Sequence, residues 1–299
     1  MRRHITWEEK MKIAKTIEEV REQIAAWKAE GLTIGLCPTM GFLHEGHASL
    51  MDASVKHCDR TVASVFVNPI QFGPSEDLAD YPRDFEHDCR LLENHGVDMV
   101  FHPDPSEMYF EDFCTYVDID VLSKTLCGKT RPIHFRGVCT VITKLLHIVE
   151  PDCIFFGQKD AQQLAIIRRM VRDLNFSVEV IGCPIVREPD GLAKSSRNTY
   201  LSPEARKAAV ILSRAVRLGQ DLVEKGEYRS LQLTDAMKAK LAEEPMADPE
   251  YVEVVNGLNM QPVETFKKGD LVAMAVRIDG TRLIDNFTVG DPKITCSED

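Results

Sequence analysis

The first 185 residues alternate between apolar strand-like runs and amphipathic helix-like runs. Buried strands are predicted over residues 33–37, 61–68, 97–103, 151–157 and 177–186. Helices are predicted between them, from about residue 46 and over 81–96, 136–150 and 160–174. Strands that alternate with helices in this order form a parallel sheet with right-handed crossovers. We therefore expect an α/β fold, a Rossmann-like doubly wound parallel sheet.

Two further segments lie outside this alternation. Residues 7–30 carry apolar positions at helical spacing among alternating charges, which predicts an amphipathic helix ahead of the first strand. The turn-rich segment 187–198 ends the alternation. After it, a smaller α+β domain is predicted, with helices over 203–225 and 230–243 and strands over 251–256, 271–278 and 282–289. The expected domains are therefore 1–185 and 186–299.

Composition narrows the range of functions. The chain has 299 residues and a formal net charge of −11, so the sustained basic surface that a nucleic-acid substrate needs is not expected. The nine cysteines are scattered singly with no C-x-x-C pair, which is typical of reduced thiols in a cytosolic protein. The sequence shows neither a signal-peptide pattern nor an apolar run of transmembrane length. We expect a soluble, cytoplasmic protein that binds neither nucleic acid nor membrane.

The segment PTMGFLHEGH (38–47) lies where the first strand of the alternation breaks and a helix begins. The first turn of a helix presents unpaired backbone N–H groups and the positive end of its dipole, which together bind phosphate. His44 and His47 add imidazole donors there, and Gly41 and Gly46 remove Cβ atoms from the approach. The H-x-G-H motif therefore indicates ATP bound at its phosphates. Half of a metal site, or a surface pair without a role, would give the same short motif.

A second group of phosphate-binding residue types occurs in the turn-rich segment 187–198. Lys194, Ser195, Ser196 and Arg197 stand in the run GLAKSSRN, where two hydroxyls and a guanidinium can hold phosphate oxygens by charge-assisted hydrogen bonds. Alone, such a run is more typical of a solvated turn. Together with H-x-G-H it is similar to the second signature loop of nucleotidyl-transferring α/β enzymes, in which the two loops close over ATP.

Five blocks of the sequence, in order, resemble the pantothenate synthetase (pantoate–β-alanine ligase) family within the H-x-G-H nucleotidyltransferases. They are PTMGFLHEGH, FVNPIQFGPSEDLADYPRD, CGKTRPIHFRGVCTVITKL, FGQKDAQQ and REPDGLAKSSRNTYLS. The resemblance covers nearly all of the chain. It implies ATP-dependent ligation of pantoate and β-alanine to pantothenate, in vitamin B5 and coenzyme A biosynthesis. It also implies Mg²⁺ as a cofactor, a homodimer, and a C-terminal domain that caps the ATP site.

The implied reaction has two steps. The pantoate carboxylate attacks the α-phosphorus of ATP, which releases pyrophosphate and leaves pantoyl adenylate. The amine of β-alanine then displaces AMP. Because the carboxylate is already a nucleophile, the first step needs no catalytic Ser or Cys. It needs anions held in line and their developing charge neutralised.

The resemblance assigns ATP-binding and catalytic roles residue by residue. His44 and His47 are implied to contact the phosphates and stabilise charge at the α-phosphorus, with Met40 lending a backbone N–H. Lys159 is implied to supply a mobile positive charge. The other implied ATP-binding residues are Gly46, Gly157, Asp160, Val186, Lys194, Ser195, Ser196 and Arg197. Among these, Asp160 matches a position near the ribose, Gly157 and Val186 match backbone positions beside the adenine, and the Ser-Ser-Arg run holds the β- and γ-phosphates.

Pantoate is polar but uncharged apart from its carboxylate, so amide side chains are expected to bind it. Gln71 and Gln163 match residues that hydrogen-bond the hydroxyl and carboxylate of pantoate. The remaining positions implied to line the pantoate and β-alanine side are Pro38, Thr39, Met40, Asn68, Tyr81, Arg131 and His134. Outside such a motif a glutamine is usually a surface residue, so these assignments depend on register with the family.

Two positions leave alternatives open. Asp88 is the predicted protein ligand of Mg²⁺, but with Asp84 and Glu86 it would equally form a solvated acidic helix face. Lys194 departs from the Met found in many relatives. Its stem could cover the adenine, or its charge could add to phosphate binding.

Two other functions share part of these signals. An adenylyltransferase that makes a dinucleotide product would share H-x-G-H and a later Ser-Arg loop, but not the Gln71 and Gln163 pair. A catalytically silent nucleotide-sensing module would bind ATP without an acceptor pocket. Gln71, Gln163, Arg131 and His134 argue against that module.

Overall fold

The computed structural model describes residues 11–74 and 76–294, and within them the chain forms two compact units. The first unit takes in the described part of Met1–Asp118 with Arg136–Phe156 and Val171–Cys183. The second takes in Ile119–Phe135, Gly157–Met170 and the described part of Pro184–Asp299. The expected boundary at 185–186 stays a prediction, because compactness groups 119–135 and 157–170 with the C-terminal segment.

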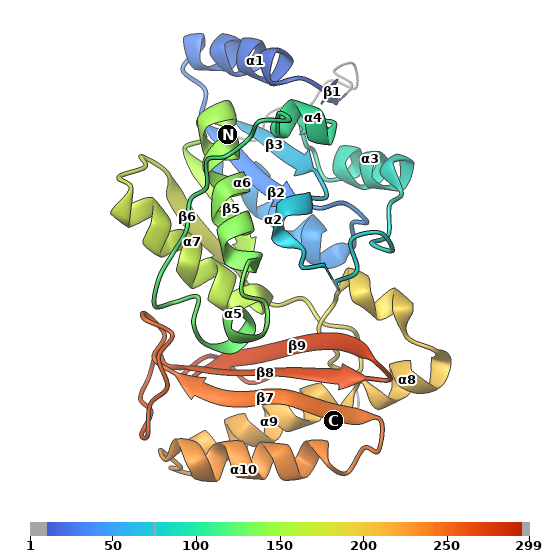
Figure 1. Cartoon of the computed structure of the whole chain (residues 1–299), viewed down its shortest axis with the longest axis vertical. Coiled ribbons are helices and arrows are strands. Elements are labelled where there is room, and N and C mark those ends of the chain that lie inside the picture. Colours follow the sequence, from blue (N-terminus) through green and yellow to red (C-terminus); the bar gives the residue numbers. More distant parts are fainter. Residues whose placement is uncertain (1–10, 75, 295–299) are drawn as a thin grey trace. The chain divides into compact units, whose positions relative to one another are not determined.

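A six-stranded sheet forms the centre of the first unit as far as the chain is described (Figure 1). Its order is β1-β4-β3-β2-β5-β6, and β1 with β4, β4 with β3, β3 with β2, and β2 with β5 pair in parallel. The strands are β1 (Lys12–Ala14), β2 (Ile34–Thr39), β3 (Arg60–Val65), β4 (Met99–Phe101), β5 (Cys153–Gly157) and β6 (Glu179–Cys183). This confirms the predicted doubly wound α/β fold.

Helices connect these strands. They are α1 (Ile17–Ala29), α2 (Glu45–His57), α3 (Phe85–Asn94), α4 (Pro105–Met108), α6 (His134–Val149) and α7 (Ala161–Asp173). Residues of α2, α3 and the strands form a shared core in which Cys37, Met51, Ala63 and Phe155 are fully buried. The apolar runs that were predicted as buried strands are therefore buried, as a parallel sheet with helices on both faces requires.

The predicted helix over 7–30 is partly wrong. Residues 7–10 lie outside the described residues, and Lys12–Ala14 form β1, which pairs with Met99–Phe101 of β4. The helix begins at Ile17 because Thr16 caps it. The Thr16 hydroxyl accepts the Glu19 N–H (3.2 Å), and the Glu19 carboxylate accepts the Thr16 N–H (3.1 Å). Charge alternation over a short edge strand resembles the polar face of a helix, which is why the sequence pattern did not separate the two.

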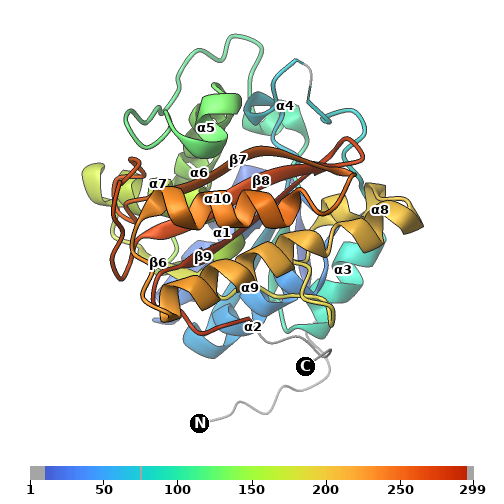
Figure 2. The same ribbon diagram turned by 90° about the horizontal axis from the view of Figure 1, so that it is seen from below.

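The second unit contains an antiparallel sheet in the order β7-β8-β9, formed among residues 247–288. Its strands are β7 (Ala247–Val255), β8 (Leu271–Ile278) and β9 (Thr281–Thr288). Helices α9 (Ile211–Glu224) and α10 (Ser230–Leu241) cover one face of this sheet, side by side, as Figures 1 and 2 show. The predicted α+β composition is confirmed.

Shorter elements complete the second unit. They are α5 (Leu126–Thr130), α8 (Pro203–Ala208), and the 3-10 helices η2 (Gln158–Asp160) and η3 (Ser196–Tyr200); η1 (Pro69–Gln71) belongs to the first unit. The single helix predicted over 203–225 is wrong, because the chain divides it into α8 and α9 at residues 209–210. No helix among residues 11–74 and 76–294 is long and apolar enough to span a membrane.

The start of α1 gives a test of the corrected boundary. Thr16→Ala removes the hydroxyl acceptor of the cap, and we expect it to lower the free energy of unfolding by about 1 kcal/mol. Thr16→Asp keeps an acceptor at that position and should stay within about 0.5 kcal/mol of the wild type. Urea denaturation followed by circular dichroism measures both. Equal losses in the two variants would contradict the assigned cap.

Candidate active site

The turn between β2 and α2 carries the H-x-G-H motif. Thr39 ends β2 and is buried; its hydroxyl donates to the Ser64 carbonyl oxygen (2.7 Å) and accepts the Gly41 N–H (3.2 Å). Two residues of the turn, Gly41 and Phe42, have positive φ angles, of 85° and 51° respectively. Such a φ is uncommon for a bulky side chain, so Phe42 keeps it only where its surroundings hold it.

Asp88, in the first turn of α3, holds this turn. Its two carboxylate oxygens accept the N–H groups of Phe42 (2.9 Å) and Leu43 (2.7 Å), and Asp88 is 1% exposed. Burial raises the pKa of the Asp88 carboxyl, and the two backbone donors oppose that rise. The alternative of a solvated acidic face is therefore wrong for Asp88. A carboxylate whose oxygens both accept backbone N–H groups is poorly suited to bind Mg²⁺, and a supporting role fits better.

His44 and His47 cap the start of α2 reciprocally. His44 is the N-cap residue, and its Nδ1 accepts the Gly46 N–H (3.1 Å), while Nδ1 of His47 accepts the His44 N–H (3.3 Å). The two ring centroids lie 4.2 Å apart. A neutral imidazole whose Nδ1 accepts a hydrogen bond carries its proton on Nε2. Both rings are thus held in the tautomer that offers Nε2–H as a donor, at a helix N-terminus that already favours anions.

An amide network follows β3. Asn68 donates from Nδ2 to Gln71 Oε1 (2.9 Å) and to the Gly137 carbonyl oxygen (3.1 Å), and its Oδ1 accepts the Tyr109 hydroxyl (2.7 Å). Gln71 Nε2 donates in turn to the Met40 sulfur (3.1 Å). The predicted residues Met40, Asn68 and Gln71 are therefore brought together. Asn68, 1% exposed, contacts protein groups on both sides of its amide and supports Gln71.

Close packing fixes the segment around Gln71. A Cβ atom at Gly137 would lie 2.5 Å from the Gln71 Cα, so only glycine lets α6 approach this closely. The predicted residue Tyr81 is 6% exposed and meets the Phe72 ring edge-on, with centroids 6.0 Å apart. Pro38 is half-buried at the end of β2. Tyr81 is therefore packed into the first unit, and Pro38 is partly covered there.

A cavity of about 670 Å³ in the second unit gathers predicted residues of both substrate groups. The predicted residues that line it are Arg131, His134, Lys159, Asp160, Gln163, Ser195 and Arg197. They come from the segment around α5, from η2 with the start of α7, and from η3. Residues far apart in sequence thus share one cavity, although His44 and its neighbours belong to the other unit.

The segment that leads to Ser195 is a tight hairpin. Arg187 bridges Ala193 in antiparallel fashion, and the Lys194 N–H donates to the Val186 carbonyl oxygen (3.0 Å). The Ser195 hydroxyl accepts the Arg197 N–H (3.3 Å) and caps η3. The Lys194 ammonium lies 3.2 Å from the Glu188 carboxylate, so its charge is paired within the hairpin. Among the predicted site residues of the second unit, those outside the cavity lining are Gly157, Val186, Lys194 and Ser196.

Residues of the strands and of α5 that the sequence analysis missed complete this cavity. They include Cys127, Tyr251, Arg282, Asp285 and Asn286. Arg282 pairs with Glu250 through Nη2 (2.9 Å) and Nε (3.1 Å), and the Cys127 sulfur lies 3.1 Å from the Tyr251 hydroxyl. The sequence contained one signal for Asp285 and Asn286, because both are polar residues inside the strand-like run RLIDNFTV (282–289). A polar side chain that is buried in a strand needs a hydrogen-bonding partner, so such residues are candidates for a structural or functional role.

Comparison with known proteins gives consistent matches. The family model described as pantoate-beta-alanine ligase matches residues 12–288. The pantothenate synthetase of Ruminiclostridium cellulolyticum is 53% identical over 278 residues, 93% of this chain and 99% of that protein. The pantothenate synthetase of Clostridium novyi is 54% identical over 271 residues, 91% of this chain and 96% of that protein.

Solved structures agree with the sequence matches. A crystal structure of pantothenate synthetase from Thermus thermophilus has a TM-score of 0.88 at 44% identity, covering 93% of this chain and 99% of that one. A pantoate-beta-alanine ligase from Francisella tularensis, complexed with beta-gamma ATP and beta-alanine, has a TM-score of 0.77 at 29% identity, covering 95% and 100%.

The contacts of Asp88 separate a supporting role from metal binding. Asp88→Ala frees the N–H groups of Phe42 and Leu43, and we expect turnover to fall about 10- to 100-fold, as for other residues that orient catalytic groups. The Mg²⁺ concentration for half-maximal rate should stay within about twofold, because metal-ligand loss would weaken that affinity by about 10-fold or more. Asp88→Asn keeps one acceptor oxygen, so its turnover should lie between that of the wild type and that of Asp88→Ala. A Mg²⁺ requirement that rises in step with the lost rate would contradict the supporting role.

Proposed function

This chain belongs to the pantoate–β-alanine ligase family and is an enzyme of that activity, and we propose that it joins pantoate and β-alanine through a pantoyl-adenylate intermediate. In the first step the pantoate carboxylate attacks the α-phosphorus of ATP and pyrophosphate leaves. In the second step the β-alanine amine attacks the acyl carbon, and AMP leaves. The observation that carries the proposal is the fixed tautomer of His44 and His47 at a helix N-terminus, since two Nε2–H donors suit a phosphate that gains charge.

We assign the charge-stabilising role at the α-phosphorus to His44 and His47, with Met40 and Gly46 as backbone contacts of the phosphates. Neither imidazole can accept a proton at Nε2 in the tautomer described above. The attacking group is a carboxylate, which has no proton to give up. The proposed first step therefore needs hydrogen-bond donors, and the Nε2–H groups of His44 and His47 provide them.

The second unit supplies positive charge and hydroxyls for the triphosphate. Lys159, Ser195 and Arg197 line one cavity, which supports a role for them, with Ser196, in holding the β- and γ-phosphates. Asp160 lines the same cavity and is assigned to the ribose. Gly157 and Val186 are assigned to the adenine through their backbones. Because its ammonium is paired with Glu188, Lys194 is assigned to adenine contact through its stem.

Pantoate and β-alanine are assigned to two groups of polar residues. Gln71, which Asn68 and Met40 contact, provides an amide in the first unit, and Pro38, Thr39 and Tyr81 of the same unit are assigned to the pantoate side with it. Gln163, Arg131 and His134 line the cavity of the second unit. The Francisella tularensis relative complexed with an ATP compound and β-alanine supports ATP and β-alanine as ligands of this chain.

Mg²⁺ is proposed to arrive with ATP. Among residues 11–74 and 76–294, no three His, Cys, Asp or Glu side chains are grouped as a metal site. Asp88 is 1% exposed and already holds the backbone of the turn before His44, so it is assigned to support that turn and not to bind an ion that keeps several water ligands. Hard cations on ATP are held mainly by phosphate oxygens and water, which need few protein ligands.

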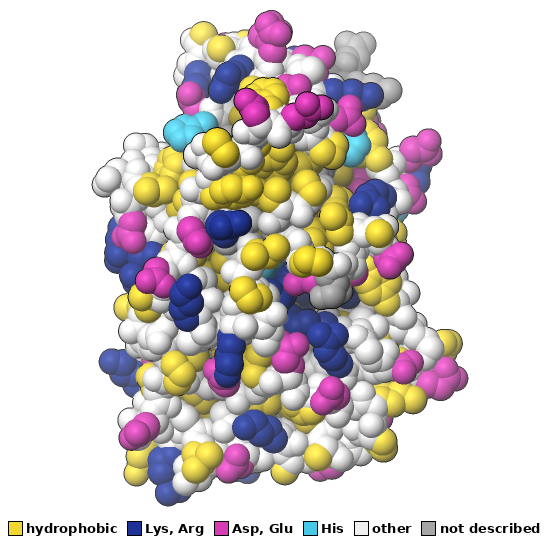
Figure 3. Space-filling model, in the orientation of Figure 1, with side chains coloured by type: hydrophobic (Ala, Val, Ile, Leu, Met, Phe, Trp, Pro, Cys, Tyr) yellow, Lys and Arg dark blue, Asp and Glu magenta, His cyan; other side chains and the backbone are white. Residues whose placement is uncertain are grey.

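We also propose a cytoplasmic homodimer in which the C-terminal domain, 186–299, caps the ATP site. Support for a subunit contact comes from the first unit, where Phe110 is 69% exposed and Tyr116 43% exposed. Aromatic side chains are enriched at protein contacts. On the face drawn in Figure 3, hydrophobic side chains gather in the upper half, and basic and acidic side chains are interspersed. Interspersed charge fits a small-molecule enzyme better than a nucleic-acid binder.

ATP–pyrophosphate exchange tests the intermediate. With ATP, Mg²⁺ and labelled pyrophosphate, we expect exchange only when pantoate is present, and without any need for β-alanine. The reason is that adenylate formation is reversible and precedes the amine. Exchange that does not depend on pantoate would point to a different adenylyl acceptor, such as the substrate phosphate of an adenylyltransferase that makes a dinucleotide. No exchange in the presence of active ligase would rule out a free adenylate step.

One substitution at His44 separates its structural role as the N-cap of α2 from its proposed role as a hydrogen-bond donor to the phosphate. His44→Asn places Oδ1 where Nδ1 accepts the Gly46 N–H, but it has no counterpart of Nε2. We expect adenylate formation to slow about 100- to 1,000-fold, the usual loss for a transition-state donor, while ATP affinity changes less than about threefold. Rapid-quench kinetics and calorimetry measure the two. His57→Ala, at the exposed end of the same helix, is the matched control and should behave as wild type. Equal losses in rate and affinity would contradict the role.

A further inference from the structure

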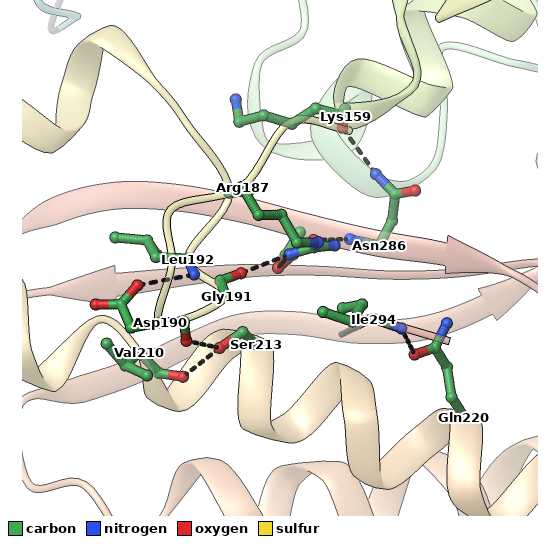
Figure 4. Close-up of polar contacts among 12 residues, drawn as sticks. Lys159, Arg187, Asp190, Gly191, Leu192, Val210, Ser213, Gln220, Asn286 and Ile294 are labelled. Atoms are coloured by element: carbon green, nitrogen blue, oxygen red, sulfur yellow. Dashed lines mark hydrogen bonds and ion pairs between the residues drawn. The ribbon is translucent and has the colours of Figure 1, made fainter. Parts of the chain in front are cut away.

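We propose that Asp285 and Asn286, adjacent residues of β9, are positioning residues that set the distance between the two loops carrying Lys159 and Ser195 with Arg197. The inference rests on the proposed role of these loops in holding the triphosphate of ATP. Neither Asp285 nor Asn286 was assigned a role from the sequence. Figure 4 shows the side chain of Asn286 directed at the Lys159 backbone and Arg187 directed at the same strand.

Both residues are buried in β9, between the apolar residues Ile284 and Phe287. Asp285 is 1% exposed and Asn286 is 6% exposed. Adjacent strand residues point to opposite faces of a sheet, so the two polar groups serve different neighbours. Burying an unmatched amide or carboxylate destabilises the folded state, so the hydrogen-bonding partners of these two residues show which segments the strand holds.

Asp285 holds the hairpin that leads to Ser195. Its carboxylate accepts two hydrogen bonds from Arg187, at 2.7 Å from Nη1 and 2.9 Å from Nη2. Arg187 Nη1 also donates to the Gly191 carbonyl oxygen (3.0 Å), across the turn of the hairpin. Since Arg187 bridges Ala193, this bidentate pair fixes both arms of the hairpin to β9. Asn198 Nδ2 donates to the Ala193 carbonyl oxygen (3.1 Å) and so connects η3 to the same anchor.

Asn286 holds the loop that carries Lys159. Its Nδ2 donates to the Lys159 carbonyl oxygen (2.8 Å) and to the Gln158 carbonyl oxygen (3.2 Å). These carbonyls belong to η2, which is too short to be rigid alone. The Lys159 side chain is 19% exposed and lines the cavity with Ser195 and Arg197. The amide of Asn286 thus fixes the backbone from which the Lys159 ammonium reaches into the cavity.

One dipeptide therefore holds two loops that come from distant parts of the sequence. Because neighbouring side chains leave a strand on opposite faces, anchoring one loop to each ties the positions of both loops to the same strand. A misplacement of about 1 Å between groups that act on one substrate can cost about 100-fold in rate. The consequence is specific to the ATP-dependent half of the reaction, because the second step uses an adenylate from which pyrophosphate has already gone.

Asn286→Ala tests this, with Gln220→Ala as the matched control. Gln220 is 5% exposed in α9; it accepts the Ile294 N–H (3.1 Å) and donates to the Pro292 carbonyl oxygen (3.2 Å), and both partners follow β9 rather than belong to either loop. We expect Asn286→Ala to weaken ATP binding or slow pantoate-dependent pyrophosphate exchange by about 10- to 100-fold. The reaction of preformed pantoyl adenylate with β-alanine should stay within about threefold of wild type. Gln220→Ala should lower the melting temperature comparably and leave both steps unchanged.

Two further variants keep the test decisive. Asn286→Thr suits a strand and lacks the amide donors, so it reports on the loops even where the alanine variant fails to fold. Asp285→Asn keeps the side-chain volume and removes the charge that Arg187 meets, and it should impair the ATP step in the same way. Equal losses in both steps, or losses in Gln220→Ala as large as those in Asn286→Ala, would overturn the proposal. If wild-type exchange does not depend on pantoate, the proposed function fails, while calorimetry with ATP alone still decides the role of the dipeptide.

Discussion

The sheet of the first unit reverses its order between β2 and β5, and the placement of the functional residues depends on that reversal. From β2 the chain moves outward through β3 and β4, whereas β5 and β6 extend the sheet on the other side. At such a point the connections leave the neighbouring strands in opposite directions, so the carboxyl ends of the strands stay uncovered. The turn after β2 carries His44 and His47, and β5 ends at Gly157, just before Lys159.

Buried polar side chains behind the functional groups do the positioning in both units. Asp88 accepts backbone N–H groups of the turn before His44, and Asn68 holds Gln71. Asp285 and Asn286 hold the hairpin before Ser195 and the backbone of Lys159. Each buried group would cost stability if left unmatched, so folding and site geometry are satisfied by the same hydrogen bonds. A change that loosens these contacts therefore lowers stability and disturbs the geometry together.

The sequence predicted what periodicity and short motifs report. Apolar runs of strand length gave β2, β3, β5 and the sheet class, and the residues around Arg131, Lys159 and Ser195 do share a cavity. It did not predict β1, because three residues at a sheet edge have too short a pattern to separate from a helix. It also missed Asp285 and Asn286, whose partners Arg187 and Lys159 lie 98 and 127 residues away along the chain. Such pairings depend on tertiary placement, which local pattern does not report.

The cap and the proposed chemistry use opposite sides of the same imidazole. Nδ1 of His44 is committed to the Gly46 N–H and Nδ1 of His47 to the His44 N–H, so each proton lies on Nε2. A general base at Nε2 would need the other tautomer, and that change would put an N–H against a backbone N–H and break the cap. The cap therefore opposes base catalysis and favours donation. An enzyme whose nucleophile is a substrate carboxylate needs no base in its first step, so the cap is consistent with the donor role that we propose for both rings in adenylation.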